Sequence, residues 1–393
     1  MTFPERFSNL PPYAFPRLRS LLNGLDAGGP VVDMTIGAPK HPYPHWIMDI
    51  IVQNAAGFGG YPPNDGTPEL RAAIAGFITR RYGVTLDPET SVFPLNGTRE
   101  GLFNAALALC PETKNGQTPV VLTPNPFYQV YAVAGLAVGA EPIYVPATRQ
   151  TGFLPDYTAL PEDILNRVAV AYICTPSNPQ GAVADHAYWA ALFALAEKYD
   201  FRIFADECYS EIYRDTPPMG ALTAAAELGA DPERVLVFNS LSKRSNLAGL
   251  RSGFAAGGPQ SIQRMKGLRN YAGAPLPLPL QRVAEQVWAD DAHAEANRLL
   301  YREKLEYADT LFAGVQGYAG PEAGFFLWMP VSNGEEATKK LWTETGVKVL
   351  PGAYLGRDYH GSNPGDPYVR VALVAPMNEM QPGLIALKDC LYG

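Results

Sequence analysis

Cysteine and histidine, the side chains that most often bind transition metals, are scarce in this sequence of 393 residues. The five histidines are scattered, and we assign none of them a catalytic role. The four cysteines stand singly, without the paired spacing of a zinc site, at Cys110, Cys174, Cys208 and Cys390. We therefore expect no metal centre, and we interpret the cysteines as reduced thiols in a core.

Long runs of positive charge and long apolar runs are also absent. The net charge is −8 at pH 7 and no Lys/Arg-rich stretch offsets it, which argues against a nucleic-acid partner. The longest strongly apolar run, Val168–Cys174, is far shorter than a membrane-spanning helix. Residues 1–6 do not resemble a secretory signal. We expect a cytoplasmic protein that binds neither nucleic acid nor membrane.

The sequence does contain enough apolar residues for a large core. Hydrophobic residues make up 47% and charged residues 18%, which is typical of a globular protein and not of a disordered one. The chain is longer than one core usually requires, so we expect more than one domain. We predict an N-terminal arm at 1–45 that joins a small domain, a large domain at 46–285, and a small C-terminal domain at 286–393.

From about residue 90 to 260, short β-branched runs alternate with segments of helical apolar spacing. The predicted strands are Val120–Thr123, Pro142–Val145, Val168–Thr175, Arg202–Asp206, Val235–Asn239 and Ser252–Ala256. The predicted helices lie near 98–110, 127–139, 185–199 and 259–270. Strands separated by helices form βαβ units, so we predict an α/β fold with a mostly parallel sheet covered by helices on both faces.

After residue 280 the pattern indicates a smaller α+β unit. We predict one long helix at Gln281–Phe312, another helix near 334–346, and strands at Gly324–Met329, Val347–Leu350 and Tyr368–Val374. The first 30 residues are rich in proline and predict an extended arm with a short helix near Pro16–Asn23. We expect this arm to pack with the C-terminal unit, because the main sheet begins much later in the chain.

Polar side chains gather directly after three of the predicted strands. In chain order they are Asn178, Asp206, Tyr209, Ser240, Ser242, Lys243 and Arg251. Ligands bind at the carboxyl ends of the strands in an open parallel sheet. We therefore expect an amide, an acid with a phenol, and a lysine flanked by hydroxyls and arginines to meet in one site.

These residue types suit the chemistry of pyridoxal 5′-phosphate. A lysine such as Lys243 forms an imine with an aldehyde when burial beside other cations lowers its pKa. An aspartate such as Asp206 keeps a pyridine nitrogen protonated, so that the ring accepts electrons. The phosphate needs N–H groups at a helix N-terminus and a cation, which the segment 96–100 and Arg251 can supply.

Over essentially its whole length the sequence resembles the class I/II aminotransferases, which are fold-type-I pyridoxal phosphate enzymes. The resemblance is carried by Gly37, Tyr61, Gly97-Thr98-Arg99, Asn178-Pro179, Asp206 with Tyr209, Ser240-Leu241-Ser242-Lys243, Arg251 and Arg370. It implies a large domain with a mostly parallel sheet sandwiched by helices, and a smaller α+β domain. It also implies amino-acid and keto-acid substrates, and a homodimer with shared active sites.

The resemblance further implies a role for each position. Lys243, which binds the cofactor, Asp206, which pairs with the pyridinium nitrogen, and Tyr209 are the implied catalytic residues. The implied phosphate contacts are Gly97, Thr98, Arg99, Ser240, Ser242, Arg251 and, from a second copy of the chain, Tyr61. The remaining implied contacts are Tyr128 stacked on the ring, Asn178 at the ring oxygen and the substrate, and Gly37 and Arg370 at the substrate α-carboxylate.

Within the family, the sequence is most similar to the N-succinyldiaminopimelate aminotransferases of lysine biosynthesis. The similar segments are 36–42, 125–129, 206–213 and 242–246, although Ala38 stands where we expect Glu. This similarity implies amino transfer between N-succinyl-LL-2,6-diaminopimelate and 2-oxoglutarate. Lys40, Arg99 and Arg244 are our candidate donors to the distal carboxylates of that substrate.

Other functions are compatible with the same residues, because a fold does not fix a reaction. The amino donor could instead be aspartate, alanine, an aromatic amino acid or kynurenine. The same cofactor could serve a carbon–sulfur β-lyase. A cofactor-binding regulator without catalysis is a further alternative, which the acidic charge and the lack of a helix-turn-helix domain disfavour.

Overall fold

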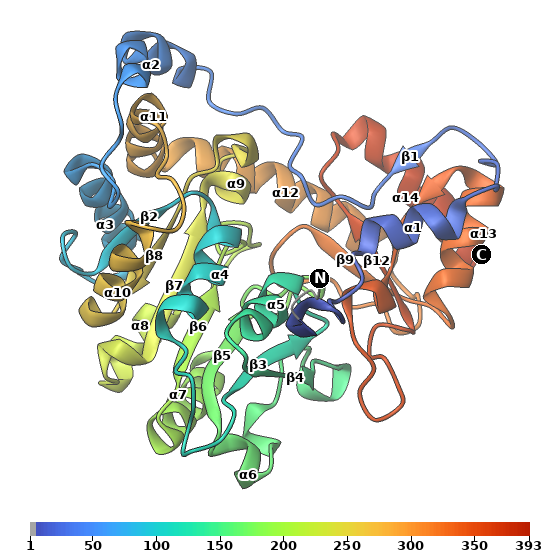
Figure 1. The fold of residues 1–393 in the computed structure, drawn as a ribbon. Coiled ribbons are helices and arrows are strands. Elements are labelled where there is room, and N and C mark those ends of the chain that lie inside the picture. Colours follow the sequence, from blue (N-terminus) through green and yellow to red (C-terminus); the bar gives the residue numbers. More distant parts are fainter. Residues whose placement is uncertain (1–4) are drawn as a thin grey trace.

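A seven-stranded sheet forms the centre of the larger part of the molecule (Figure 1). The computed structural model describes residues 5–393. The strands are β2 (Val92–Leu95), β3 (Val120–Asn125), β4 (Glu141–Pro146), β5 (Val168–Cys174), β6 (Arg202–Asp206), β7 (Val235–Ser240) and β8 (Gly253–Gly257). Their order is β2-β8-β7-β6-β5-β3-β4, and only β8 runs against its neighbours. The predicted α/β fold with a mostly parallel sheet is confirmed.

Helices cover both faces of this sheet. One face packs on α4 (Thr98–Leu109), α5 (Gln129–Ala137) and α10 (Pro259–Arg269). The other face packs on α3 (Pro68–Tyr82), α7 (His186–Tyr199), α8 (Ala221–Leu228) and α11 (Leu278–Ala289). Strand β7 illustrates the alternation, because Val235 and Val237 face one cluster and Leu236 and Phe238 face the other. Apolar residues on both sides explain why the strand sequences are continuous apolar runs.

Capping residues set both ends of α3, a helix that the sequence pattern left unassigned. The hydroxyl of Thr67 accepts from the backbone N–H of Leu70 at the start of α3, and Pro68 occupies the first turn. Gly83 ends α3 in the left-handed conformation, with φ of 69°. Strand β2 and helices α2 (Ile47–Gln53), α3, α8 and α14 (Met377–Tyr392) were not among the predicted elements.

The N-terminal arm joins the C-terminal elements, as expected. Strand β1 (Val32–Asp33) pairs in parallel with β10 (Val347–Lys348), and Figure 1 shows blue α1 (Ala14–Leu22) and β1 among the orange and red elements. A second small sheet has the antiparallel order β11-β12-β9. Its strands are β9 (Phe326–Pro330), β11 (Leu350–Pro351) and β12 (Tyr368–Ala372), beside α13 (Gly334–Thr345). The domain boundaries at 45 and 285 stay a prediction.

The single long helix predicted at Gln281–Phe312 is wrong. The segment forms two helices, α11 and α12 (Ala292–Leu311), which are interrupted at Asp290 and Asp291. The side chain of Asp290 accepts from the backbone N–H of Ala292 at 3.1 Å, which satisfies a donor at the new helix start. Among residues 5–393, no helix is both long and apolar enough to cross a membrane.

Candidate active site

A cavity of about 380 Å³ opens where the parallel strands β5, β6 and β7 end. The predicted site residues that line it are Thr98, Arg99, Tyr128, Asn178, Asp206, Tyr209, Ser240, Ser242, Lys243 and Arg251. Strand register explains the convergence, because Cys174, Asp206 and Phe238 are neighbours across β5, β6 and β7. The residues that follow these positions must therefore meet at one edge.

Lys243 lies in the short helix α9 (Leu241–Arg244), directly after β7. Its Nζ donates a hydrogen bond to the carbonyl oxygen of Gly37, and the ring of Phe325 lies 5.4 Å away. Burial lowers the pKa of Lys243 to about 8, and the guanidinium of Arg370 acts in the same direction. A substantial fraction of this amine is thus neutral near physiological pH, as a nucleophile requires.

Asp206 is a buried carboxylate at the end of β6. Its Oδ2 accepts from the hydroxyl of Tyr131 at 2.7 Å, and its Oδ1 accepts from the backbone N–H of Cys208 at 3.3 Å. Burial raises the pKa of Asp206, whereas these hydrogen bonds and the charge of Lys243 act against that rise. A cation bound beside Asp206 would offset the remaining cost of burying its charge.

The N-terminus of α4 and the side chain of Arg251 form a cradle for an anion. Gly97 caps α4 with φ of 85°, and a Cβ there would lie 2.1 Å from Nη2 of Arg251. Only glycine allows this approach. Thr98, Ser240 and Ser242 add hydroxyls to the lining of the same cavity. A helix N-terminus, hydroxyls and a guanidinium together suit a phosphate.

Arg370, on β12, is a buried cation that has no carboxylate among its hydrogen-bond partners in the described chain. It donates to Oδ1 of Asn178 at 3.1 Å and to the carbonyl oxygen of Thr35 at 2.8 Å, and it lies over the ring of Phe326. Its Nε has no partner among residues 5–393. Burial lowers its pKa to about 10, so the group stays charged at neutral pH. A buried, unpaired guanidinium of this kind suits a substrate carboxylate.

Tyr128 and Arg99 contact each other at the cavity wall. The Nε of Arg99 donates to the hydroxyl of Tyr128 at 2.6 Å. The Tyr128 ring meets Tyr131 edge-on, with centroids 5.7 Å apart. Tyr209 lines the cavity, and its ring contacts the rings of Phe325 and Phe326 edge-on.

Several predicted site residues are not among the residues that line this cavity: Gly37 and Arg370, which hydrogen-bond to the lining residues Lys243 and Asn178, and also Gly97, Tyr61 and Lys40. Tyr61 is fully exposed at the start of the loop before α3. Lys40 is also exposed and is not among the residues that line the cavity. Their roles stay predictions, since Tyr61 was assigned to the site of a second copy and Lys40 to the mouth of the pocket.

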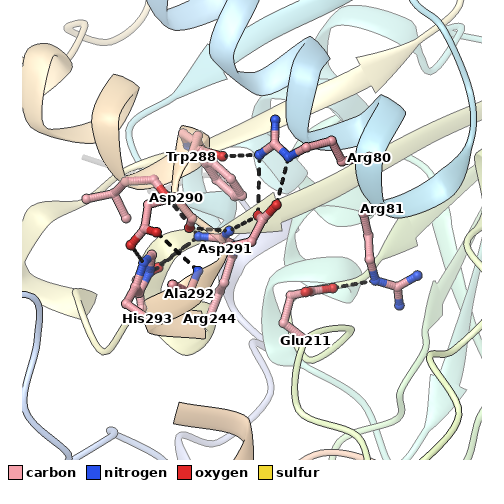
Figure 2. A network of polar contacts seen from close by, with 11 residues as sticks. Arg80, Arg81, Glu211, Arg244, Trp288, Asp290, Asp291, Ala292 and His293 are labelled. Atoms are coloured by element: carbon pink, nitrogen blue, oxygen red, sulfur yellow. Dashed lines mark hydrogen bonds and ion pairs between the residues drawn. The ribbon is translucent and has the colours of Figure 1, made fainter. Parts of the chain in front are cut away.

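The expectation that Arg244 contacts the substrate or the phosphate region is wrong. Figure 2 shows its guanidinium turned into a polar network with Asp291, and Arg80 binds the same carboxylate. Arg244 also donates to the carbonyl oxygens of Val287 and Asp290, each at 2.9 Å. The residue is almost completely buried, and a buried charge must be paired in this way. It fastens α9 to the junction of α11 and α12.

Four cavity residues, Ala248 among them, escaped prediction from the sequence. Tyr131, Cys174 and Cys208 line the cavity, so two of the thiols expected in a core border the site. Burial raises the pKa of the Cys208 thiol well above its usual range, which keeps it protonated. Tyr131 follows Tyr128 by three residues, a helical spacing that could have indicated a shared face.

The residues present fit pyridoxal phosphate. Gly97 lets the Arg251 guanidinium occupy the space that a Cβ would fill, and the resulting cradle matches a phosphate. Lys243 and Asp206 line the same cavity as this cradle and match an aldehyde and a protonated ring nitrogen. Among residues 5–393, no cluster of His, Cys, Asp or Glu could hold a metal ion.

Comparisons with known proteins give a consistent result. The family model described as aminotransferase class I and II matches residues 29–382. An LL-diaminopimelate aminotransferase of Dehalococcoides mccartyi is 31% identical, covering 99% of both chains. The solved structure of an aminotransferase from Neisseria meningitidis is similar with a TM-score of 0.94 at 37% identity, covering 98% of this chain and 99% of its own. A structure described as "probable N-succinyldiaminopimelate aminotransferase" from Thermus thermophilus gives 0.82 at 26%, covering 96% and 98%.

Proposed function

The chain belongs to the family of class I and II aminotransferases, and from this premise we propose that it exchanges amino groups between a diaminopimelate-type donor and 2-oxoglutarate, with pyridoxal phosphate held by Lys243. One observation carries the proposal. The buried amine of Lys243 and the carboxylate of Asp206 line one cavity, and the buried guanidinium of Arg370 donates to Asn178, which lines the same cavity. Lys243 matches the aldehyde of the cofactor, Asp206 matches its ring nitrogen, and Arg370 matches the carboxylate of a substrate.

The reaction assigns one task to each residue. When bound, pyridoxal phosphate supplies an aldehyde that condenses with amines and a ring that accepts the electron pair left at the substrate α-carbon. Arg370 and Asn178 orient the α-carboxylate. Lys243 Nζ takes the proton from the α-carbon and returns one, as a general base and then acid. Asp206 holds the proton on the ring nitrogen, and the cradle at Gly97 fixes the phosphate.

The cations near the cavity favour free LL-diaminopimelate as the donor. Its distal end carries one carboxylate and one ammonium group, whereas the succinylated form presents two distal carboxylates. Arg251 belongs to the phosphate cradle and Arg244 is fully engaged elsewhere, which leaves Arg99 for a distal carboxylate. The LL-diaminopimelate aminotransferases among the relatives support the same choice. N-succinyl-LL-2,6-diaminopimelate remains the second candidate, supported by the segments 36–42 and 125–129 and by the Thermus structure.

A panel of amino donors with 2-oxoglutarate as acceptor tests the donor assignment. The panel contains LL-diaminopimelate, its N-succinyl derivative, aspartate, alanine, aromatic amino acids and kynurenine. We expect LL-diaminopimelate to give the highest kcat/KM. A higher value for the succinylated donor would select the second candidate, and a preference for any other donor would reject both.

Arg99→Ala should raise the KM for LL-diaminopimelate more than the KM for glutamate. The reason is that the longer donor carries an additional charged end, and a charge-assisted hydrogen bond to it is worth about 1.5–3 kcal/mol. The KM of Lys40→Ala for the N-succinyl donor is measured in the same series. A raised KM would indicate that this exposed residue contacts the bound succinyl donor. Equal changes of KM for both donors in the Arg99 variant would remove Arg99 from the specificity site.

The surface around Tyr61 supports the proposed homodimer. Exposed large apolar side chains gather between residues 43 and 61, where Val52 is 73% exposed; they are Tyr43, Met48, Val52, Phe58 and Tyr61. A monomer rarely exposes so many neighbouring apolar groups without a partner. We propose that a second copy covers this 43–61 patch, and that Tyr61 reaches the phosphate cradle of that copy.

Mixing two damaged chains tests the shared site. Lys243→Ala lacks the amine and Tyr61→Ala lacks the phosphate contact, but a mixed dimer contains one site in which both groups are intact. Refolding the two variants together should therefore give more activity than the sum of the separate proteins. A fully active monomer in light scattering would contradict an obligate interface, which should bury more than ~2,000 Å². No gain in activity on mixing would contradict the shared active site.

A further inference from the structure

Three polar side chains are buried behind Lys243, outside the cavity. They are His41, which follows the Gly37 segment, and Asn297 and Lys304 on α12; each is at most 8% exposed. Lys304 Nζ lies 2.6 Å from Nε2 of His41, and Nδ1 of His41 lies 2.9 Å from Oδ1 of Asn297. The amide of Asn297 donates to the backbone carbonyl oxygen of Lys243 at 3.3 Å.

In the hydrogen bonds that join Lys304, His41 and Asn297, each residue donates to the next in that order. An ammonium group only donates, so Nε2 of His41 accepts and its Nδ1 carries the proton. His41 then donates to the oxygen of Asn297, which leaves the Asn297 amide hydrogens for backbone carbonyls. Burial and the charge of Lys304 both lower the pKa of His41, which keeps the imidazole neutral as this pattern requires.

This row of hydrogen bonds also links three segments that carry site residues. Lys304 donates to the carbonyl oxygen of Leu373 at 3.1 Å, three residues beyond Arg370. His41 lies four residues after Gly37, whose carbonyl oxygen accepts from Lys243 Nζ. Asn297 holds the turn that carries Lys243 itself. A network of buried polar groups that is satisfied at every link fixes its members rigidly.

Lys304 makes this arrangement unlike ordinary core packing. The ammonium group is 1% exposed, yet its hydrogen bonds go to a neutral ring and a carbonyl oxygen, not to a carboxylate. Burial lowers its pKa to about 8. An apolar side chain would fill the same space at lower cost, so the placement indicates a role beyond stability.

We propose that Lys304, His41 and Asn297 form a positioning relay that fixes the main chain of Lys243 relative to Gly37 and Arg370. The relay touches neither substrate nor cofactor. It holds Lys243 Nζ within reach of the substrate α-carbon whose carboxylate Arg370 binds. The proposal rests on the proposed amino transfer for its kinetic consequence, whereas the geometry of Lys243 is independent of the substrate.

His41→Phe tests the relay, because it keeps a ring against Tyr301 (centroids 4.5 Å apart for His41) but removes both nitrogens. Misplacing Lys243 should lower kcat by roughly 10- to 100-fold while KM for the amino donor stays near the wild-type value. His41→Gln offers one donor and one acceptor and should restore most of kcat. His186→Phe, at an exposed histidine of α7, is the matched control and should change neither constant.

A spectroscopic measurement separates the relay from the proposed function. The visible absorption of pyridoxal phosphate bound to Lys243 changes with protonation of that linkage, so its pH midpoint reports the surroundings of Nζ without turnover. We expect a shifted midpoint in His41→Phe and in Asn297→Leu, the second variant if the first does not fold, and none in His186→Phe. Wild-type midpoints and kcat in folded relay variants, or equal losses in His41→Phe and His41→Gln, would overturn the proposal. If the wild type shows no amino transfer but the midpoints still shift in the relay variants, only the proposed function would be rejected.

Discussion

Replacing Lys243 by alanine should abolish amino exchange while leaving cofactor binding in place. The variant loses both the amine that holds the cofactor and the base that moves the α-proton. The loss of activity should reach at least the ~10²–10⁴-fold typical of general acid–base catalysis alone. The phosphate cradle at Gly97 and Arg251 is untouched, so pyridoxal phosphate should still bind, although without a covalent link.

The control for this variant is Lys198→Ala, an exposed lysine on α7. It removes the same side chain from the same protein and should leave exchange unchanged. Activity is measured as amino exchange with 2-oxoglutarate, and covalent attachment by mass spectrometry after borohydride reduction. Near wild-type exchange in the Lys243 variant, or attachment at another lysine, would contradict the assignment.

Asp206→Asn should have the second-largest effect. An amide has nearly the shape of the carboxylate and can still accept from the hydroxyl of Tyr131, but it carries no charge to hold a proton on the ring nitrogen. Removing one preorganised electrostatic group of this kind costs ~10²–10³-fold in kcat. Tyr131→Phe, which removes only a hydrogen bond to Asp206, should cost much less.

The same substitution should not destabilise the cofactor-free protein. Burial raises the pKa of Asp206 in the fold, so the ionised group is less favourable in the folded than in the unfolded chain at neutral pH. Asparagine removes this cost. We expect the Tm of cofactor-free Asp206→Asn to equal or exceed that of the wild type, and a clearly lower Tm would indicate that Asp206 serves the fold and not the reaction.

Local sequence predicts the parallel sheet well, for a physical reason. The run Val168–Cys174 is apolar at every position because helices cover both faces, and the predicted strand differs from β5 by one residue. Residues that follow such strands must lie at one edge, so the strand pattern alone groups Asn178, Asp206 and Lys243. Their chemical roles remain proposals that the variants above test.

Contacts between distant segments could not be read from local patterns. The break between α11 and α12 contains Asp291, whose partners Arg80 and Arg244 lie 211 and 47 residues away in the chain. The same ion pair withdraws Arg244 from the site, contrary to expectation (Figure 2). Tyr131 reaches Asp206 across 75 residues, and His41 reaches Asn297 across 256. Only folding brings these partners together.

The most direct test of the central claim is a half-reaction without any keto-acid acceptor. Purified protein loaded with pyridoxal phosphate is mixed with an excess of LL-diaminopimelate, and keto product and free ammonia are both quantified. Amino transfer predicts a single equivalent of keto product per Lys243 and no ammonia, followed by formation of glutamate when 2-oxoglutarate is added. Continuous release of ammonia without an acceptor would show elimination in place of transfer and would contradict the account.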